Sequence, residues 1–207
     1  MLKASDIAPA PGIQTVGVES VTALADITAD AFRDDPFNRW LFSGFDPMHR
    51  TFANLARHIY AANGFCQILQ EDGEGRAATM WLMPGDKPEG SPLAMLQTYW
   101  GLLASGGLGA LARGKAAGDA MANHHPEAPH AYLFTVGVAS AGRGRGLGRR
   151  LIQPVLDACD STNTMAYLEN SNPANQRFYH SLGFERMELF HATPESPPLE
   201  AMQRQAR

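Results

Sequence analysis

The chain has 207 residues, of which 44% are hydrophobic; this suits one folded α/β domain and is too apolar for a disordered chain. The formal net charge of -4 argues against general nucleic-acid binding, because phosphate contacts need a basic face. No apolar run reaches membrane-spanning length, and the N-terminus lacks the apolar segment of a signal peptide. Cys66 and Cys159 form no CxxC pair and predict free thiols in the cytoplasm.

The first part of the chain predicts two helices and a hairpin. Residues 1–14 are expected to form a loose arm or a first edge strand. Apolar residues at helical spacing after Ser20 predict a helix that ends near Asp34-Asp35-Pro36, and a second helical pattern covers 48–63. The stretches FCQILQ and AATMWLM, joined by the turn EDGEGR, predict an antiparallel hairpin over 65–83.

The rest of the chain alternates helices and strands. A helix is expected from Pro92 to Leu103, whereas the stretch 104–118 is rich in glycine and alanine and gives no clear element boundary. We predict strands at 130–138, 164–169 and 184–192, and helices at 147–160 and 172–182. Pro154 should kink the first of these helices. This alternation after an antiparallel hairpin predicts a mixed α/β sheet.

The stretch RGRGLG, residues 143–148, lies between a strand that ends at Val138 and a helix that begins near Gly146. Backbone amides at a helix N-terminus lack partners, and the helix dipole favours anions there. Glycine lets the backbone approach a phosphate closely, and arginine adds charge-assisted hydrogen bonds. The stretch therefore predicts a phosphate or pyrophosphate cradle. The alternatives are a surface loop with incidental glycines and a nucleic-acid-binding segment.

Two other phosphate-binding motifs are incomplete. The dinucleotide fingerprint GxGxxG fails because Arg149 stands where its third glycine is needed. The segment from Gly109 to Lys115 satisfies GxxxxGK, but Ala116 follows it and supplies no hydroxyl for Mg²⁺. We interpret that match as an accident of a Gly/Ala-rich region, with a phosphate-transferring enzyme kept as a second functional class.

The segment from Val138 to Gly148 resembles the acetyl-CoA signature of the GNAT N-acetyltransferases, Arg/Gln-x-x-Gly-x-Gly/Ala. A second element of that superfamily follows at 172–179, with Gly183-Phe184 after it, and the resemblance is firm over about 130–190. Within the superfamily, the run from Asp34 to Phe37, Trp40 and the WLMPG run at 81–85 resemble the branch that contains puromycin-type acetyltransferases.

The resemblance implies one domain over 1–207 of the α/β (α+β) class, with a central, mixed, mostly antiparallel sheet flanked by helices. The termini, 1–14 and 193–207, are expected to be loose. The strand at 132–138 would splay from the strand at 164–169, and unpaired backbone groups in the gap would hold the pantetheine arm of acetyl-CoA. Gly137 suggests a local bulge that opens this pair, or else a packing glycine.

The resemblance also implies a set of cofactor-binding residues. They lie on the splayed strand, in the glycine-rich loop and helix start, and in the second element: Val136, Gly137, Val138, Arg143, Gly144, Arg145, Gly146, Leu147, Gly148, Arg149, Asn172, Asn175 and Phe178. Asn172, which stands before a proline, is also a candidate N-cap, and the two roles can coexist.

Tyr179 and Glu169 are the candidate catalytic residues. Tyr179 matches the tyrosine of the family and would protonate the departing sulfur; the alternative is a core tyrosine. Glu169 ends a strand beside the expected thioester and would take a proton from the amine, unless it is a strand-end salt bridge. The amide of Val138 would polarise the carbonyl oxygen. The seven histidines indicate no metal site, and His130 is either a proton relay or a solvated side chain.

The acceptor is expected to be a small-molecule primary amine, with a protein N-terminus or lysine as the alternative. Asp34 and Asp35 would hold its cationic amine; the alternative is that they only end a helix. An apolar pocket would be walled by Phe37, Trp40 and Trp81, with Tyr99; the alternative is that these side chains belong to the core. A non-catalytic module that binds CoA is the third functional class. An exposed sheet edge would also allow a homodimer.

Overall fold

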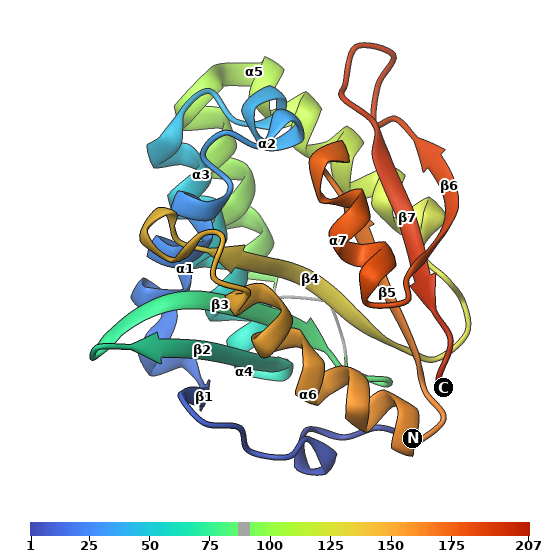
Figure 1. Ribbon diagram of the computed structural model, residues 1–207. Coiled ribbons are helices and arrows are strands. Elements are labelled where there is room, and N and C mark those ends of the chain that lie inside the picture. Colours follow the sequence, from blue (N-terminus) through green and yellow to red (C-terminus); the bar gives the residue numbers. More distant parts are fainter. Residues whose placement is uncertain (87–91) are drawn as a thin grey trace.

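The computed structural model describes residues 1–86 and 92–207 and shows one seven-stranded sheet with helices on both faces (Figure 1). The strand order is β1-β2-β3-β4-β5-β7-β6; β4 and β5 run parallel, and the other neighbouring pairs are antiparallel. The strands are β1 Ile13–Val16, β2 Phe65–Glu71, β3 Glu74–Leu82, β4 His130–Val138, β5 Met165–Asn170, β6 Glu185–Phe190 and β7 Leu199–Arg204. The predicted mixed, mostly antiparallel sheet is confirmed.

The helices form two layers. On one face lie α1 Val21–Ala31, α2 Pro36–Leu41, α3 Phe45–Leu55 with its continuation through the π-helical turn Ala56–Tyr60 and α4 Ala61–Asn63, and α5 Pro92–His124. On the other face lie α6 Leu147–Ser161 and α7 Gln176–Ser181, which the 3-10 turn Pro173–Asn175 precedes (Figure 1). Short 3-10 turns also occur at Ala4–Asp6, Val18–Ser20 and Ser140–Gly142. Within the described ranges, no helix combines the length and apolarity needed to cross a bilayer.

Each face of the sheet carries its own apolar core, because neighbouring residues of a strand point to opposite faces. Met80 and Trp81 on β3 are both fully buried, yet Met80 packs beneath α1 and Trp81 packs beneath α6. On β5, Tyr167 packs in the same core as Met80, and Leu168 packs in the same core as Trp81. Helix α6 continues through Pro154, so the proline does not end it.

The strand pair β4 and β5 separates after a short contact, as predicted. Their paired residues are confined to 130–132 and 165–167. Beyond this point β4 continues to Val138 beside β3, whereas β5 continues to Asn170 beside β7. The backbone edges of the two strands that face each other are therefore unpaired over several residues, and this gap lies at the centre of the sheet.

The predicted bulge at Gly137 was wrong. The extra residue is Phe134, because Trp81 pairs with Leu133 and Met80 with Thr135. Gly137 pairs regularly; a Cβ there would lie 3.0 Å from the Cβ of Ala31 and 3.3 Å from the Cα of Thr28. Glycine is needed here because α1 packs closely on the strand.

The Gly/Ala-rich stretch 104–118 belongs to α5. Non-helical backbone at Gly106 and Gly107 divides this long helix into two parts, and Gly107 takes a left-handed conformation with φ of 63°. The GxxxxGK match from Gly109 to Lys115 lies within the second helical part. It follows no strand and forms no loop, so the nucleotide-binding interpretation of this segment is wrong.

The prediction of a loose C-terminus at 193–207 was also wrong. Residues Leu199–Arg204 form β7, which lies between β5 and β6 and pairs with both, so 184–192 does not hold the last strand. Glu200 and Arg204 interrupt the apolar pattern of this strand, yet both are buried because each has charged partners. At the other end, the edge strand β1 begins only at Ile13, near the end of the range 1–14 in which a loose arm or an edge strand was expected, and Leu2 is buried rather than loose.

We predict that Asp160→Asn lowers the free energy of unfolding by about 2–4 kcal/mol. Both carboxylate oxygens of Asp160 accept hydrogen bonds of 2.7 Å from the buried Arg204 guanidinium. The amide would leave that charge uncompensated. Arg204 holds the pKa of Asp160 below its ordinary value of 3.8. The pair's contribution is therefore present near neutral pH and lost as the pH falls below about 4.

Urea unfolding monitored by circular dichroism measures this loss. Asp157→Asn is the matched control, because Asp157 lies on the same helix, is exposed and accepts a hydrogen bond from Gln153. Its charge acts on Arg204 from a distance, without the direct hydrogen bonds that Asp160 accepts. Equal stability of the two variants at neutral pH would show that the Asp160 pair does not anchor β7.

Candidate active site

A cleft of about 460 Å³ lies where the loop after β4 leads into α6. Its walls come from that loop, the end of α1, the turn before α7 and α7 itself. The lining includes every predicted cofactor-binding residue except Gly137 and Arg145: Val136, Val138, Arg143, Gly144, Gly146, Leu147, Gly148, Arg149, Asn172, Asn175 and Phe178. The predicted residues in this set, which span 42 positions from Val136 to Phe178, thus share one cavity.

The glycine-rich loop lines this cleft, and its backbone geometry suits an anion. Gly144 and Gly146 have φ of 75° and 74°, a left-handed conformation that glycine adopts without strain. The first helical hydrogen bond of α6 runs from the Arg150 amide to the Gly146 carbonyl, so the preceding amides have no helical partner. A Cβ on Gly148 would lie 3.4 Å from Phe178, and its absence leaves room at the helix start. These features fit a diphosphate.

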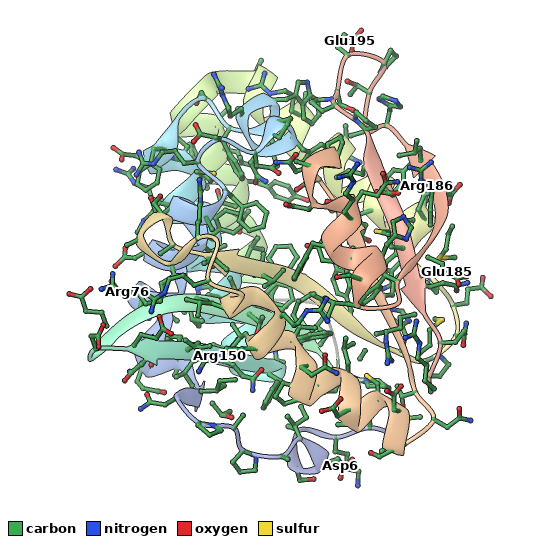
Figure 2. The ribbon with its side chains drawn as sticks, viewed as in Figure 1. Asp6, Arg76, Arg150, Glu185, Arg186 and Glu195 are labelled. Carbon is green, nitrogen blue, oxygen red and sulfur yellow. The ribbon has the colours of Figure 1, made fainter. Side chains whose placement is uncertain are left out.

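The arginine side chains mainly brace the loop. Arg143 donates to the Ala31 carbonyl at the end of α1 over 3.2 Å. Arg145 and Arg150 both pair with the carboxylate of Glu71 at the end of β2, over 2.8 and 3.1 Å. Figure 2 shows Arg150 on α6, which crosses the β2–β3 hairpin. Arg145 therefore contacts the hairpin rather than lining the cleft.

We predict that Glu71→Gln weakens acetyl-CoA binding by about 3- to 10-fold, because two partly exposed ion pairs of up to about 1 kcal/mol each would be weakened. The loop would lose its tether to the hairpin, whereas the chemistry would be unaffected, so kcat should not change. Isothermal titration with acetyl-CoA measures the effect. Glu74→Gln is the control, since Glu74 pairs with Arg76 on the same hairpin. Unchanged affinity in Glu71→Gln would contradict the tether.

A second cavity, of about 570 Å³, adjoins the cleft. The two cavities share Phe32, Val136, Asn175 and Tyr179. We call the second cavity the chamber. Its walls are mostly apolar and aromatic side chains from α1 to α3, the π-helical turn, α5 and β4, among them Phe37, Leu41, Phe52, Ile59, Tyr60, Tyr99, Leu102, Met121 and Phe134. The rings of Tyr60 and Phe134 stack with centroids 4.2 Å apart.

Glu169 lines the chamber near the end of β5. Its side chain is only 2% exposed. The Tyr132 hydroxyl donates to Oε2 over 2.7 Å. Oε1 has no hydrogen-bond partner among the residues that the structure describes and lies 3.6 Å from Nδ1 of His125. One carboxylate oxygen is thus anchored, and the other is free to accept a proton.

Tyr179 lies on α7 and lines both the cleft and the chamber. It packs in the core on the α6 face, whereas Tyr132, the partner of Glu169, packs on the opposite face. The phenol and the carboxylate thus approach the gap between β4 and β5 from opposite sides. Burial, aided by the charge of Asp35, raises the pKa of Tyr179 well above its ordinary value, so its hydroxyl keeps its proton at neutral pH.

The predicted acceptor residues are only partly brought together. Phe37 lines the chamber, and Trp40 packs against it with ring centroids 5.3 Å apart. Trp81 is fully buried in the core beneath α6, so its assignment to the acceptor pocket was wrong. Trp81 follows Met80 directly in β3, so the two side chains point to opposite faces of the sheet.

Asp34 and Asp35 line the cleft rather than the chamber. The expectation that Asp35 ends a helix was wrong: α1 ends at Ala31, and Asp35 is the N-cap of α2. One carboxylate oxygen of Asp35 accepts from the Asn38 amide over 2.9 Å, and the other accepts from Ser171 over 2.7 Å. Burial raises the pKa of Asp35. This carboxyl ties the turn after β5 to α2.

Sequence reasoning missed the chamber walls and the neighbours of Glu169. Phe52, Tyr60 and Phe134 come from separate elements and converge only in the fold. Tyr132 and Glu169 have one signal in the sequence: each lies on a predicted strand of the splayed pair. The parallel register, with Tyr132 opposite Tyr167, was needed to bring them together. No group of three or more His, Cys, Asp or Glu side chains in the described ranges could hold a metal ion.

The splayed sheet and the cleft place the chain in a known class of α/β proteins. Residues 76–184 match the family model described as the acetyltransferase (GNAT) family. The chain therefore belongs to the GNAT acetyltransferase family. The resemblance to the puromycin-type branch stays a prediction.

Three relatives illustrate the similarity. The chain is 37% identical, over 36% of its length and 31% of the relative's, to Uncharacterized N-acetyltransferase C550.08 of Schizosaccharomyces pombe. It is 38% identical, over 33% of its length and 27% of the relative's, to N-alpha-acetyltransferase 40 of Saccharomyces cerevisiae. These matches thus span about a third of the length of the curated relatives. A Corynebacterium glutamicum structure described as histone acetyltransferase HPA2 and related acetyltransferase shares the fold, with a TM-score of 0.68 and 23% identity, over 96% of this chain and 98% of that chain.

Proposed function

We propose that the chain is an acetyl-CoA-dependent N-acetyltransferase that transfers an acetyl group to the primary amine of a small molecule, by direct attack in a ternary complex. The observation that carries the proposal is the junction of the two cavities. The cleft with its loop amides meets the apolar chamber at Val136 and Tyr179, and Glu169 lies on the chamber wall.

The residues present fit acetyl-CoA. The amides of 143–148 would hold its diphosphate, and the left-handed glycines let the loop wrap around it. The pantetheine arm would lie in the gap along β4. The Ala139 amide donates to the Arg76 carbonyl on β3, so the backbone of Val138 faces the other way, into the gap. Asn172 and Asn175 line the same cleft, and Asn172 also accepts a hydrogen bond from the Ala174 amide.

When bound, acetyl-CoA supplies an acetyl group activated as a thioester. Glu169 removes a proton from the acceptor ammonium and leaves a neutral amine that can attack. The Val138 amide donates to the carbonyl oxygen as negative charge develops there. Tyr179 donates its proton to the departing sulfur and regains one from the nitrogen as the amide bond forms.

The chamber favours a small amine with an apolar or aromatic part. Its walls include the rings of Phe52, Tyr60 and Phe134, and its volume of about 570 Å³ lies in the range of small-molecule sites. A buried aromatic ring contributes about 2 kcal/mol, which corresponds to roughly 30-fold in affinity or kcat/KM. We therefore expect discrimination of that order between 2-phenylethylamine and ethylamine.

An acceptor panel tests this function. Purified protein is mixed with acetyl-CoA and 2-phenylethylamine, ethylamine or a peptide with a free N-terminus, and free thiol is followed with time. We expect the fastest release with the aromatic amine. Thiol release with none of a broad amine panel, together with no thermal shift on adding CoA, would contradict the proposal.

A protein N-terminus is the second candidate acceptor. The similarity to N-alpha-acetyltransferase 40 of Saccharomyces cerevisiae favours it. Faster turnover of the peptide than of every small amine would select it. If the chain is instead a non-catalytic module that binds CoA, the unaltered protein should bind CoA and turn over no amine. The Glu169→Gln and Tyr179→Phe variants should then behave in the same way.

A further inference from the structure

The proposed reaction releases one proton to solvent in each turnover. An ordinary amine has a pKa of about 10, so the acceptor arrives as an ammonium ion with three N–H bonds. The amide product keeps one of them. One of the two lost protons ends on the sulfur of CoA, and the other must leave the site. Because the side chain of Glu169 is only 2% exposed, that proton needs a path to water.

Two histidines join Glu169 to the surface. His125 follows α5 and places Nδ1 3.6 Å from Oε1 of Glu169. Its Nε2 lies 2.9 Å from Nε2 of His130, the first residue of β4. Nδ1 of His130 lies 2.7 Å from the Ala128 carbonyl oxygen. The His125 side chain is 33% exposed and His130 is half-buried, so both rings reach the surface, whereas the carboxylate does not.

The hydrogen-bond partners assign the ring protons. A carbonyl oxygen only accepts, so His130 carries its proton on Nδ1, and Nε2 of the neutral ring accepts. His125 therefore donates from Nε2 and turns the lone pair of Nδ1 toward Glu169. Burial lowers the pKa of His130, which favours the neutral ring at pH 7.

In this arrangement no proton lies between Glu169 and His125. Oε1 of Glu169 and Nδ1 of His125 are both acceptors, and 3.6 Å is too long for a hydrogen bond. Oε1 is also a buried atom that finds no hydrogen-bond partner in the described part of the chain. A proton that arrives on Oε1 makes it a donor that attracts Nδ1, so the proton can pass once the two atoms close to hydrogen-bond distance. We infer that His125 and His130 carry the proton from Glu169 to solvent, an inference that rests on the function proposed above.

The transfer balances atom by atom. The O–H bond of Glu169 breaks as an Nδ1–H bond forms on His125, and the Nε2 proton of His125 moves to Nε2 of His130. His130 then turns its Nδ1–H away from the Ala128 carbonyl, which cannot take the proton, and gives that proton to water; exchange with water restores the starting tautomers. Neither histidine touches the reacting atoms, so both are positioning residues that act through Glu169.

The groups that face this pair come from both strands. Tyr132 of β4 and Tyr167 of β5 pack edge-on against His125. Burial, together with the charge of Glu169, raises the pKa of both phenols well above the ordinary value, so they remain protonated. Glu188 of β6 pairs instead with His124, over 2.8 Å. Glu169 is thus the carboxylate in contact with His125 among the described residues.

Steady-state kinetics test the relay. In dilute buffer His125→Gln should lower kcat roughly 10- to 100-fold, with the KM for acetyl-CoA unchanged. Added imidazole or another small buffer base should restore kcat in proportion to its concentration, which a packing defect would not allow. His124→Gln, one residue away, should match the unaltered protein. An undiminished kcat in His125→Gln, or a loss that no buffer base restores, would overturn the inference.

Nitrogen NMR of the imidazole rings tests the relay without turnover. The resting protein should show Nδ1–H on His130 and Nε2–H on His125. In His130→Phe the His125 proton should move to Nδ1, where Glu169 accepts it. The opposite tautomers would overturn the relay even if no acceptor amine is found. The expected tautomers with a silent amine panel would support the proton path and place the failure in the proposed function.

Discussion

Glu169→Gln is expected to lower kcat by about 100- to 10,000-fold, the usual contribution of a general base. The amide keeps the shape of the side chain and can still accept the hydrogen bond from Tyr132, but it cannot take a proton from the acceptor ammonium. The loss should shrink as the pH approaches the acceptor's own pKa of about 10, because solution then supplies the neutral amine. Thiol release across a pH series, with the preferred amine, measures both effects.

Glu188→Gln is the matched control for this experiment. Glu188 is an exposed carboxylate on β6 that pairs with His124, so kcat should be unchanged in this variant. Acetyl-CoA affinity, measured by titration, should be the same in both variants, because Glu169 lies outside the cofactor cleft. A Glu169→Gln enzyme with full kcat at neutral pH would remove Glu169 from the mechanism.

The second large effect is expected at the start of α6. Gly148→Leu should weaken acetyl-CoA binding more than 100-fold while the protein stays folded. The missing Cβ of Gly148 leaves a space beside Phe178 and Val138 that opens into the cleft. A leucine would fill the position that a diphosphate must approach. Its Cβ alone would lie 3.4–3.8 Å from Phe178, Val138 and Val136, so the larger side chain also costs about 1–3 kcal/mol of packing, and calorimetry must show that the variant is folded.

Gly101→Leu separates this steric effect from a general effect of leucine in a helix. Gly101 lies in α5, and a Cβ added there meets no atom of the described residues within 4 Å. The acetyl-CoA affinity of Gly101→Leu should equal that of the unaltered protein. Calorimetry records the thermal midpoints of Gly101→Leu and Gly148→Leu. Retained affinity in a folded Gly148→Leu variant would mean that the diphosphate lies elsewhere.

Much of the sheet and the cleft could be predicted because the signals are local. The EDGEGR turn places Asp72 and Gly73 at φ of 55° and 77°, the two left-handed residues of a tight hairpin turn. The glycine-rich loop is followed at once by its helix, and their geometry depends on residues that are close in the sequence. The resemblance to the GNAT family supplied the splay of β4 from β5.

The remaining features depend on long-range contacts. Strand β7 has buried charges, and the partners that make Glu200 tolerable, Arg186, Asn170 and Gln176, come from three other segments. The walls of the chamber come from helices on both sides of the gap between β4 and β5. The ring of His125 meets Glu169 only because β4 and β5 start in parallel register. Hydrophobic periodicity carries none of this information.

A crystal structure of the complex with CoA tests the central claim most directly. We predict that the diphosphate lies on the amides of 143–148 and that the CoA sulfur lies within about 3.5 Å of the Tyr179 hydroxyl, at the junction with the chamber. A diphosphate bound away from this loop, or a sulfur remote from both Tyr179 and the chamber, would contradict the account.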